Sequence, residues 1–199
     1  MKTIGKFLFK FRSYTPIPFF FIMILFMKPN LYTILSGFPV VLIGEIIRIW
    51  AVSYAGSETR TTDGVGGSNL VTQGPFSVVR NPLYIGNIMI YTGLGIMSFS
   101  LFPYIQILAL ICFSFQYYCI ILNEEEYLKT AFGENFSIYL KSVNRFAPLK
   151  SKIPGNIKSK LQFDLKSGLK SEIRSLQSIT ISVAIIVIYY ILFILNKSN

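Results

Sequence analysis

Five apolar segments, nearly free of charge, run through this chain. They are residues 14–27, 31–54, 82–97, 102–122 and 179–195. Charged residues make up only 14% of the chain, against roughly 25% in soluble domains. A helix that crosses a bilayer needs about 20 apolar residues, so the sequence predicts an all-α, multi-pass transmembrane protein with about five spans. The first segment is short and begins near Pro16 and Pro18, so it either spans at a tilt or inserts only in part.

The basic residues are divided unequally between the two sides that these segments define. If all five segments cross, 16 of the 19 lysines and arginines fall on one side. Lys28 and Lys197 fall on the other side, and Arg48 lies inside a segment. Cytosolic loops of membrane proteins carry such an excess. We therefore expect the N-terminus, the loop 56–81 and the region 123–178 in the cytosol, and the net charge of +10 requires no nucleic-acid partner.

The segments and loops divide the chain into four predicted regions. Residues 1–55 form an N-terminal membrane hairpin, 56–148 a core, 149–178 a basic interfacial segment and 179–199 a C-terminal transmembrane helix. Within the third region, apolar residues recur every four positions among lysines, which is typical of an amphipathic helix lying on anionic headgroups. A solvated linker is the alternative. The apolar stripe consists of Leu161, Leu165, Leu169 and Ile173.

The composition excludes several kinds of site. The chain contains no histidine, which removes the commonest general base and the commonest metal ligand. Cys112 and Cys119 lie inside one apolar segment, where cysteine is usually a reduced packing residue. We therefore predict no metal site and no disulfide framework. No small-residue cleavage site follows the first apolar segment, so we expect no cleaved signal peptide.

Two charged residues, Glu45 and Arg48, lie inside the second apolar segment. They are three positions apart and so share one helix face. Charges within a span are costly and mark either a structural pair or a functional site. The sequence leaves open whether they form an ion pair or line a polar cavity that reaches into the bilayer.

Polar residues that could bind a ligand or take part in a reaction flank the third and fourth segments. Asn81 and Pro82 suit the first turn of a helix, with Asn81 as the N-cap. Arg80 beside them, and the free N–H groups of a helix start, also suit a carboxylate ligand. Glu124-Glu125-Glu126 follow the fourth segment, where acids oppose the helix dipole. They form either a solvated collar or a site for a cationic partner.

The order of these motifs resembles the isoprenylcysteine carboxyl methyltransferase family and the related phospholipid methyltransferases. The resemblance covers about residues 44–148. The matching residues are Leu70-Val71, Gly74-Pro75-Phe76, Arg80-Asn81-Pro82, Tyr84 and Gly86, then Glu124-Glu125, Leu128, Phe132-Gly133, Phe136, Tyr139 and Arg145. Two departures are Asn81, where the family's most familiar form has histidine, and the apolar residues 119–122, where eukaryotic prenylcysteine enzymes have basic ones.

The resemblance implies a membrane-embedded methyltransferase that uses S-adenosylmethionine. It implies that the loop before the third segment and the acidic residues after the fourth hold the cofactor, with Glu124 or Glu125 on its cationic end. It also implies that Arg145 lies near the substrate, so Arg145 and Glu125 are the candidate catalytic residues. The implied cofactor-binding residues are Asn69, Leu70, Val71, Phe76, Arg80, Asn81, Pro82, Leu83, Tyr84, Gly86, Glu124 and Glu125.

The sequence does not identify the molecule that accepts the methyl group. The expected partners are membrane lipids and a lipidic substrate, either a carboxylate of the isoprenylcysteine kind or a phospholipid amine. A carboxylate needs no general base, which suits a chain without histidine. An amine must arrive neutral or lose a proton, with Glu124 or Glu125 as the first candidate. The alternatives are a non-catalytic membrane protein and a nicotinamide-dependent reductase with the same fold.

Overall fold

The chain is a bundle of helices in a computed structural model that describes residues 2–56, 69–148, 153–159 and 161–198. Among these residues there is no strand, which confirms the predicted all-α class. The predicted glycine-rich part of the loop, residues 57–68, lies outside the described residues. The elements are α1 (Lys2–Phe11), α2 (Pro16–Leu25), α3 (Leu31–Ala55), η2 (Gly74–Ser77), α4 (Pro82–Ser98), α5 (Tyr104–Ser142), η3 (Gly155–Ile157) and α6 (Leu165–Ser198).

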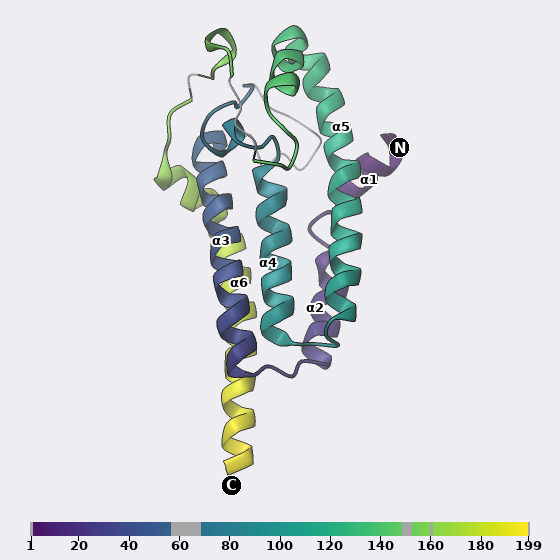
Figure 1. Cartoon of the computed structure of the whole chain (residues 1–199), viewed down its shortest axis with the longest axis vertical. Helices are drawn as coiled ribbons and strands as arrows, with labels where there is room; N and C mark the ends of the chain where they lie inside the picture. The colour runs from purple at the N-terminus through teal and green to yellow at the C-terminus, as the bar shows by residue number, and fades with distance from the viewer. Residues whose placement is uncertain (1, 57–68, 149–152, 160, 199) are drawn as a thin grey trace.

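Three of the described helices, α3, α5 and α6, are long and apolar enough to cross a membrane. The number becomes four if α1 and α2, which meet at a bend of 53°, form one broken span. The predicted count of about five is therefore not reached. The predicted segment 82–97 forms α4, which is not counted because its 17 residues rise only about 26 Å, less than the thickness of a hydrocarbon core, about 30 Å. This helix runs between the α3–α6 pair and the α5–α2 pair (Figure 1).

Helix α5 continues well past the apolar part of the sequence. It has 39 residues, and its section before Gly133, residues 104–132, rises about 43 Å, whereas a hydrocarbon core is about 30 Å thick. The apolar stretch ends at Leu122, so the helix carries Glu124 and the residues after it beyond the membrane-spanning part. At Gly133 the backbone has φ 53° and ψ −121°, which divides α5 into a long first section and a short second one.

Two pairs of glycines bring α3 and α4 into direct backbone contact. A Cβ at Gly37 would lie 2.5 Å from the carbonyl oxygen of Gly93, and one at Gly44 would lie 2.8 Å from that of Gly86. Atoms cannot approach so closely, so only glycine permits this crossing. Small residues at helix crossings are typical of membrane proteins, where close packing replaces the hydrophobic effect between helices.

Arg48 joins three helices inside the bundle. Its Nη2 lies 2.6 Å from Oε2 of Glu172 on α6 and 3.1 Å from Oγ of Ser175. Its Nη1 donates a hydrogen bond to Oδ1 of Asn87 on α4, and its Nε lies 3.8 Å from Oε2 of Glu45. The Glu45–Arg48 pair is thus part of a larger polar cluster. Arg48 also lines a cavity. The pair is therefore both an ion pair and, through Arg48, part of a cavity wall.

Replacing Glu172 with glutamine is expected to lower the free energy of unfolding by about 3 kcal/mol, because breaking a buried ion pair leaves the other charge uncompensated. Glu172 is only 1% exposed. Thermal unfolding in detergent measures the change. Glu134→Gln, at an exposed position on α5, is the control and should leave the stability unchanged. Equal stability of both variants would contradict a structural role for Glu172.

The C-terminal part of the chain differs from its predicted division. α6 is one continuous helix from Leu165 to Ser198, with no break near residue 178 between an interfacial and a spanning helix. Its first turns pack on the end of α3, where a Cβ at Gly168 would lie 3.0 Å from Cα of Ser53. The backbone N–H of Asp164 donates to the carbonyl of Ser53 at 2.9 Å. These contacts direct the basic residues of α6 along the bundle.

Candidate functional site

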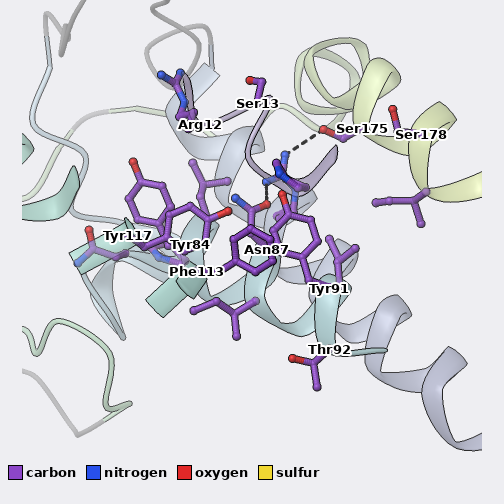
Figure 2. Close-up of a pocket in the computed structure, with 18 of the residues that line it drawn as sticks. Arg12, Ser13, Tyr84, Asn87, Tyr91, Thr92, Phe113, Tyr117, Ser175 and Ser178 are labelled. Atoms are coloured by element: carbon purple, nitrogen blue, oxygen red, sulfur yellow. Dashed lines mark hydrogen bonds between the residues drawn. The ribbon is translucent and has the colours of Figure 1, made fainter. Parts of the chain in front are cut away.

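A cavity of about 1080 Å³ runs along α4 from the loop before it toward the far end of the bundle. At one end it is lined by the loop residues Asn69 to Val71 and by the start of α4. At the other end it reaches Ser98 and Gln106. Figure 2 shows Tyr84, Asn87 and Tyr91 of α4 with Phe113 and Tyr117 in this cavity. The cavity therefore connects a polar mouth with the membrane-spanning part of the bundle.

Two segments separated by a helical hairpin meet at this mouth through one carboxylate. Oε1 of Glu125 accepts hydrogen bonds from Nη2 of Arg80 at 2.9 Å and from Nε of Arg145 at 3.0 Å. Oε2 of Glu125 lies 2.5 Å from Nη2 of Arg145. The hydrogen bond to Glu125 is the main cause that raises the pKa of Arg145. Arg80 and Glu125 thus lie at the same end of the bundle, as the sequence predicts.

The rest of the Arg80 side chain ties the loop to the end of α5. Its Nη1 donates to the carbonyl oxygens of Leu140 at 3.1 Å and Val143 at 2.5 Å. The backbone N–H of Arg80 donates to the carbonyl of Asn144 at 2.9 Å. Arg80 is therefore committed to protein contacts, and its main effect is to fix the start of α4 against α5.

Asn81 does not cap α4 as predicted. Its side chain makes no capping hydrogen bond, and its Nδ2 donates instead to the carbonyl of Arg145 at 3.3 Å. The long-range contact with the end of α5 prevails over the local cap. Pro82 does occupy the first turn of the helix, as predicted.

Glu124, in contrast with Glu125, faces the cavity. The hydroxyl of Tyr84 donates to its Oε1 at 2.6 Å. Burial raises the pKa of Glu124 to about 7, and the hydrogen bond from Tyr84 and the charge of Arg12 partly oppose this rise. A carboxylate in this state can bind a cation or exchange a proton near neutral pH.

The loop before α4 is held by contacts from two later parts of the chain. Tyr139 of α5 donates its hydroxyl hydrogen to the carbonyl of Phe76 at 2.7 Å. Oγ1 of Thr72 donates to the carbonyl of Ile157 at 3.1 Å and accepts from the N–H of Ser159 at 2.9 Å. These bonds hold residues 69–77 over the mouth of the cavity.

Ten of the twelve predicted cofactor residues line the cavity. They are Asn69, Leu70, Val71, Phe76, Arg80, Asn81, Pro82, Leu83, Tyr84 and Glu124. Gly86 instead faces α3, where a Cβ would lie 2.6 Å from Cγ of Arg48. Glu125 and Arg145, the predicted catalytic residues, are bonded to each other and are not among the lining residues.

Three polar lining residues, Asn87, Tyr91 and Tyr117, could not be identified from the sequence. Tyr117 stacks on the predicted Tyr84 with the ring centroids 4.6 Å apart, and Tyr91 packs on Phe113 at the same distance. Asn87 is the partner of Arg48. The sequence signal for Asn87 was that it is the one amide side chain within the apolar segment 82–97. Tyr91 and Tyr117 resemble ordinary packing residues until α4 and α5 are placed together.

The chain is similar to known proteins over part of its length. Residues 32–135 match the phospholipid methyltransferase family. The cobalt-zinc-cadmium resistance protein CzcN of Cupriavidus metallidurans is 34% identical over 121 residues, which are 61% of this chain and 50% of that protein. The nickel-cobalt-cadmium resistance protein NccN of Alcaligenes xylosoxydans xylosoxydans is 35% identical over 101 residues, 51% of this chain and 43% of that protein. The match therefore spans half or less of each relative's length. No solved structure matches the chain.

Proposed function

Because the chain belongs to the phospholipid methyltransferase family, we propose that it transfers a methyl group from S-adenosylmethionine to a lipidic acceptor within the membrane. One observation carries the proposal. The loop before α4, the first turn of α4 and Glu124 meet at the mouth of a single cavity, and that cavity continues between membrane-spanning helices. A small charged molecule and a lipid can therefore meet in it.

The residues at the mouth fit the charges of this cofactor. S-adenosylmethionine carries an ammonium, a sulfonium and a carboxylate, and it supplies an electrophilic methyl group when bound. Glu124 offers a carboxylate to the cationic groups. Leu83 and Tyr84, which follow Pro82 in the first turn of α4, offer N–H groups at a helix N-terminus, which favour a carboxylate. The volume of 1080 Å³ lies at the upper end for small-molecule pockets, which leaves room for part of a lipid.

The chain's own residues contribute mainly alignment. Methyl transfer is an in-line displacement, for which positioning is the largest contribution. The Arg80–Glu125–Arg145 cluster fixes the start of α4 relative to α5, and Tyr84 fixes Glu124. Glu125 and Arg145 thus act in this proposal as positioning residues. For an amine acceptor, Glu124 is the group at the mouth that accepts a proton near neutral pH.

The orientation in the membrane is part of this proposal. We propose that the mouth faces the cytosol, because the arginines and lysines of the segments that form it satisfy the positive-inside rule. Cysteine labelling of a Ser77→Cys variant from either side of the membrane tests this placement.

Binding of S-adenosylmethionine is expected to weaken about tenfold between pH 8 and pH 6, because one group with a pKa near 7 must be deprotonated to hold a cation. The sign follows from Glu124, whose raised pKa of about 7 makes it charged at pH 8 and mostly neutral at pH 6. Isothermal titration calorimetry of the detergent-purified protein measures the dissociation constants. Glu124→Gln should bind weakly at both pH values and lose the dependence.

The methyl transfer itself is tested with labelled cofactor and total membrane lipid. A labelled lipid supports the proposal, and a folded protein that neither binds the cofactor at millimolar concentration nor labels any lipid class contradicts it. That outcome would favour a non-catalytic membrane protein. Binding of a nicotinamide cofactor in place of S-adenosylmethionine would favour the reductase alternative.

A further inference from the structure

Helix α1 presents three different faces. One face is buried against α5, the second is apolar and exposed, and the third is basic and exposed. In that order, the faces are formed by Gly5 and Phe9, by Ile4, Phe7 and Phe11, and by Lys6 and Lys10. The helix therefore leaves an apolar face and a basic face for a partner outside the bundle.

The buried face fixes the depth of α1 along α5. A Cβ at Gly5 would lie 2.7 Å from the carbonyl oxygen of Cys119 and 3.1 Å from Cβ of Asn123, so the two helices cross closely at this point. The apolar stretch of α5 ends at Leu122, and the acidic residues begin at Glu124. The crossing therefore lies where α5 leaves its apolar part, which is the level of a membrane surface.

The direction of α1 differs from that of a membrane span. It meets α2 at a bend of 53°, and Figure 1 shows it leading sideways from α5, with the N-terminus outside the bundle. Its 10 residues rise about 15 Å, which is half the thickness of a hydrocarbon core. A helix with this length, depth and direction lies along a membrane surface.

The exposed apolar face suits the boundary between headgroups and acyl chains. Ile4 is 51% exposed and Phe7 is 61% exposed. The rings of Phe7 and Phe11 lie 4.7 Å apart, and positions 4, 7 and 11 share one side of a helix. The three side chains thus form one continuous stripe, which gains from burial among acyl chains.

The basic face specifies the charge of the partner. Lys6 and Lys10 are exposed and lie four positions apart, so they form a row along the helix. Nζ of Lys10 is 5.9 Å from the ring centroid of Phe11, which places this row beside the apolar stripe. No aspartate or glutamate precedes Glu45 in the chain, so no acid on α1 balances these charges. Lysines beside an apolar stripe complement the phosphates of anionic lipids.

The end of α1 forms part of the cavity wall. Phe9 lines the cavity, and so do Arg12 and Ser13 just after the helix (Figure 2). Nη1 of Arg12 donates to the carbonyl of Phe9 at 2.8 Å, and its guanidinium lies 3.9 Å from the centroid of the Phe9 ring. A movement of α1 on α5 would therefore move this section of the wall.

We propose that α1 is an interfacial helix that binds the anionic surface of the membrane, and that this contact holds the adjoining cavity wall in place. The acyl boundary takes the apolar stripe, and the lipid phosphates take the lysines. A second copy of the chain fits less well, because two identical basic rows repel each other. The surface lies outside residues 32–135, the part matched by the family, and the inference does not depend on the proposed function.

Hydrogen–deuterium exchange of the full chain in lipid nanodiscs tests the contact, because exchange reports local opening of a helix. One set of nanodiscs contains phosphatidylcholine alone, and the other contains about one third phosphatidylglycerol. Amides of residues 4–11 should exchange about tenfold more slowly in the anionic nanodiscs, and Lys6→Gln with Lys10→Gln should reduce this ratio below about threefold. Residues 12–17, which follow α1, should change in the same direction in the parent.

Matched variants separate the face of α1 from basic charge in general. Lys129→Gln with Lys141→Gln removes two charges at exposed positions on α5 and should keep the full ratio. Lys6→Arg with Lys10→Arg preserves the charge and should keep it as well, which shows that the helix tolerates changes at both positions.

Three results would overturn the proposal. Equal exchange of residues 4–11 in the two kinds of nanodisc, or an equal loss of the ratio in the α5 control, would refute the anionic contact. Protection of α1 that rises with protein concentration in detergent would assign the face to a second copy. A change confined to residues 4–11 would refute the link to the cavity wall. The test uses no S-adenosylmethionine, so failure of the methyltransferase proposal would leave its outcome unaffected.

Discussion

Replacing Glu125 with glutamine is expected to reduce methyl transfer at least about 100-fold, because misplacement of a reacting group by about 1 Å has effects of this size. One carboxylate holds both Arg80 and Arg145, so the change weakens the hold of α5 on the start of α4. The three side chains are between 12% and 26% exposed, and solvent screens part of the loss. We therefore expect a decrease of about 2 kcal/mol in the free energy of unfolding.

Two measurements separate the effect on alignment from the effect on stability. Thermal unfolding in detergent gives the stability, and labelled methyl transfer at a temperature where the variant remains folded gives the activity. Glu134→Gln on the same helix, at an exposed position, should match the parent in both. A variant Glu125→Gln with full activity would show that the cluster does not position the site.

Replacing Gly93 with valine is expected to disrupt the bundle. A Cβ at this position would lie 2.7 Å from Cγ2 of Val41 and 2.8 Å from the carbonyl oxygen of Gly37. Overpacking usually costs about 1–3 kcal/mol, and a clash with backbone that cannot move aside should reach or exceed the upper value. Size-exclusion chromatography and thermal unfolding in detergent should show aggregation or a much lower melting temperature.

Two matched glycines test whether this effect depends on the helix crossing. Gly95→Ala on the same helix meets only the flexible side chain of Gln106, with Cγ at 3.1 Å, and should be mild. Gly155→Val has no atom within 4 Å of its Cβ and should be neutral. A Gly93→Val protein as stable as the Gly155→Val protein would contradict the close packing of α3 and α4.

Ten of the twelve cofactor residues predicted from the sequence line one cavity, because the signals that picked them out are local or ordered along the chain. Arg80, Pro82, Tyr84 and Glu124 occur in recognisable motifs, and the distribution of basic residues predicts that they lie on one side of the membrane. The sequence did not predict that Glu124 faces the cavity while Glu125 pairs with Arg80 and Arg145. Two adjacent residues of a helix point about 100° apart, and only the position of α4 decides which carboxylate faces the cavity.

The predicted count of about five spans is not confirmed. Among the described helices three are long and apolar enough to cross a membrane, or four if α1 and α2 form one span, and apolar length in the sequence did not show that α4 has only 17 residues. It also gave no sign that α6 continues through the basic stretch at 165–174. The cause is a tertiary contact, since Glu172 is stabilised in the bundle by Arg48 from α3. Partners that far apart in sequence leave no periodic signal.

The position of α6 makes the part of the chain matched by the family depend on a helix outside it. The family match ends at residue 135, whereas α6 begins at Leu165. The ion pair between Arg48 of α3 and Glu172 of α6 joins the two parts inside the bundle. A chain shortened before Leu165 would therefore leave the guanidinium of Arg48 without its carboxylate partner on α6.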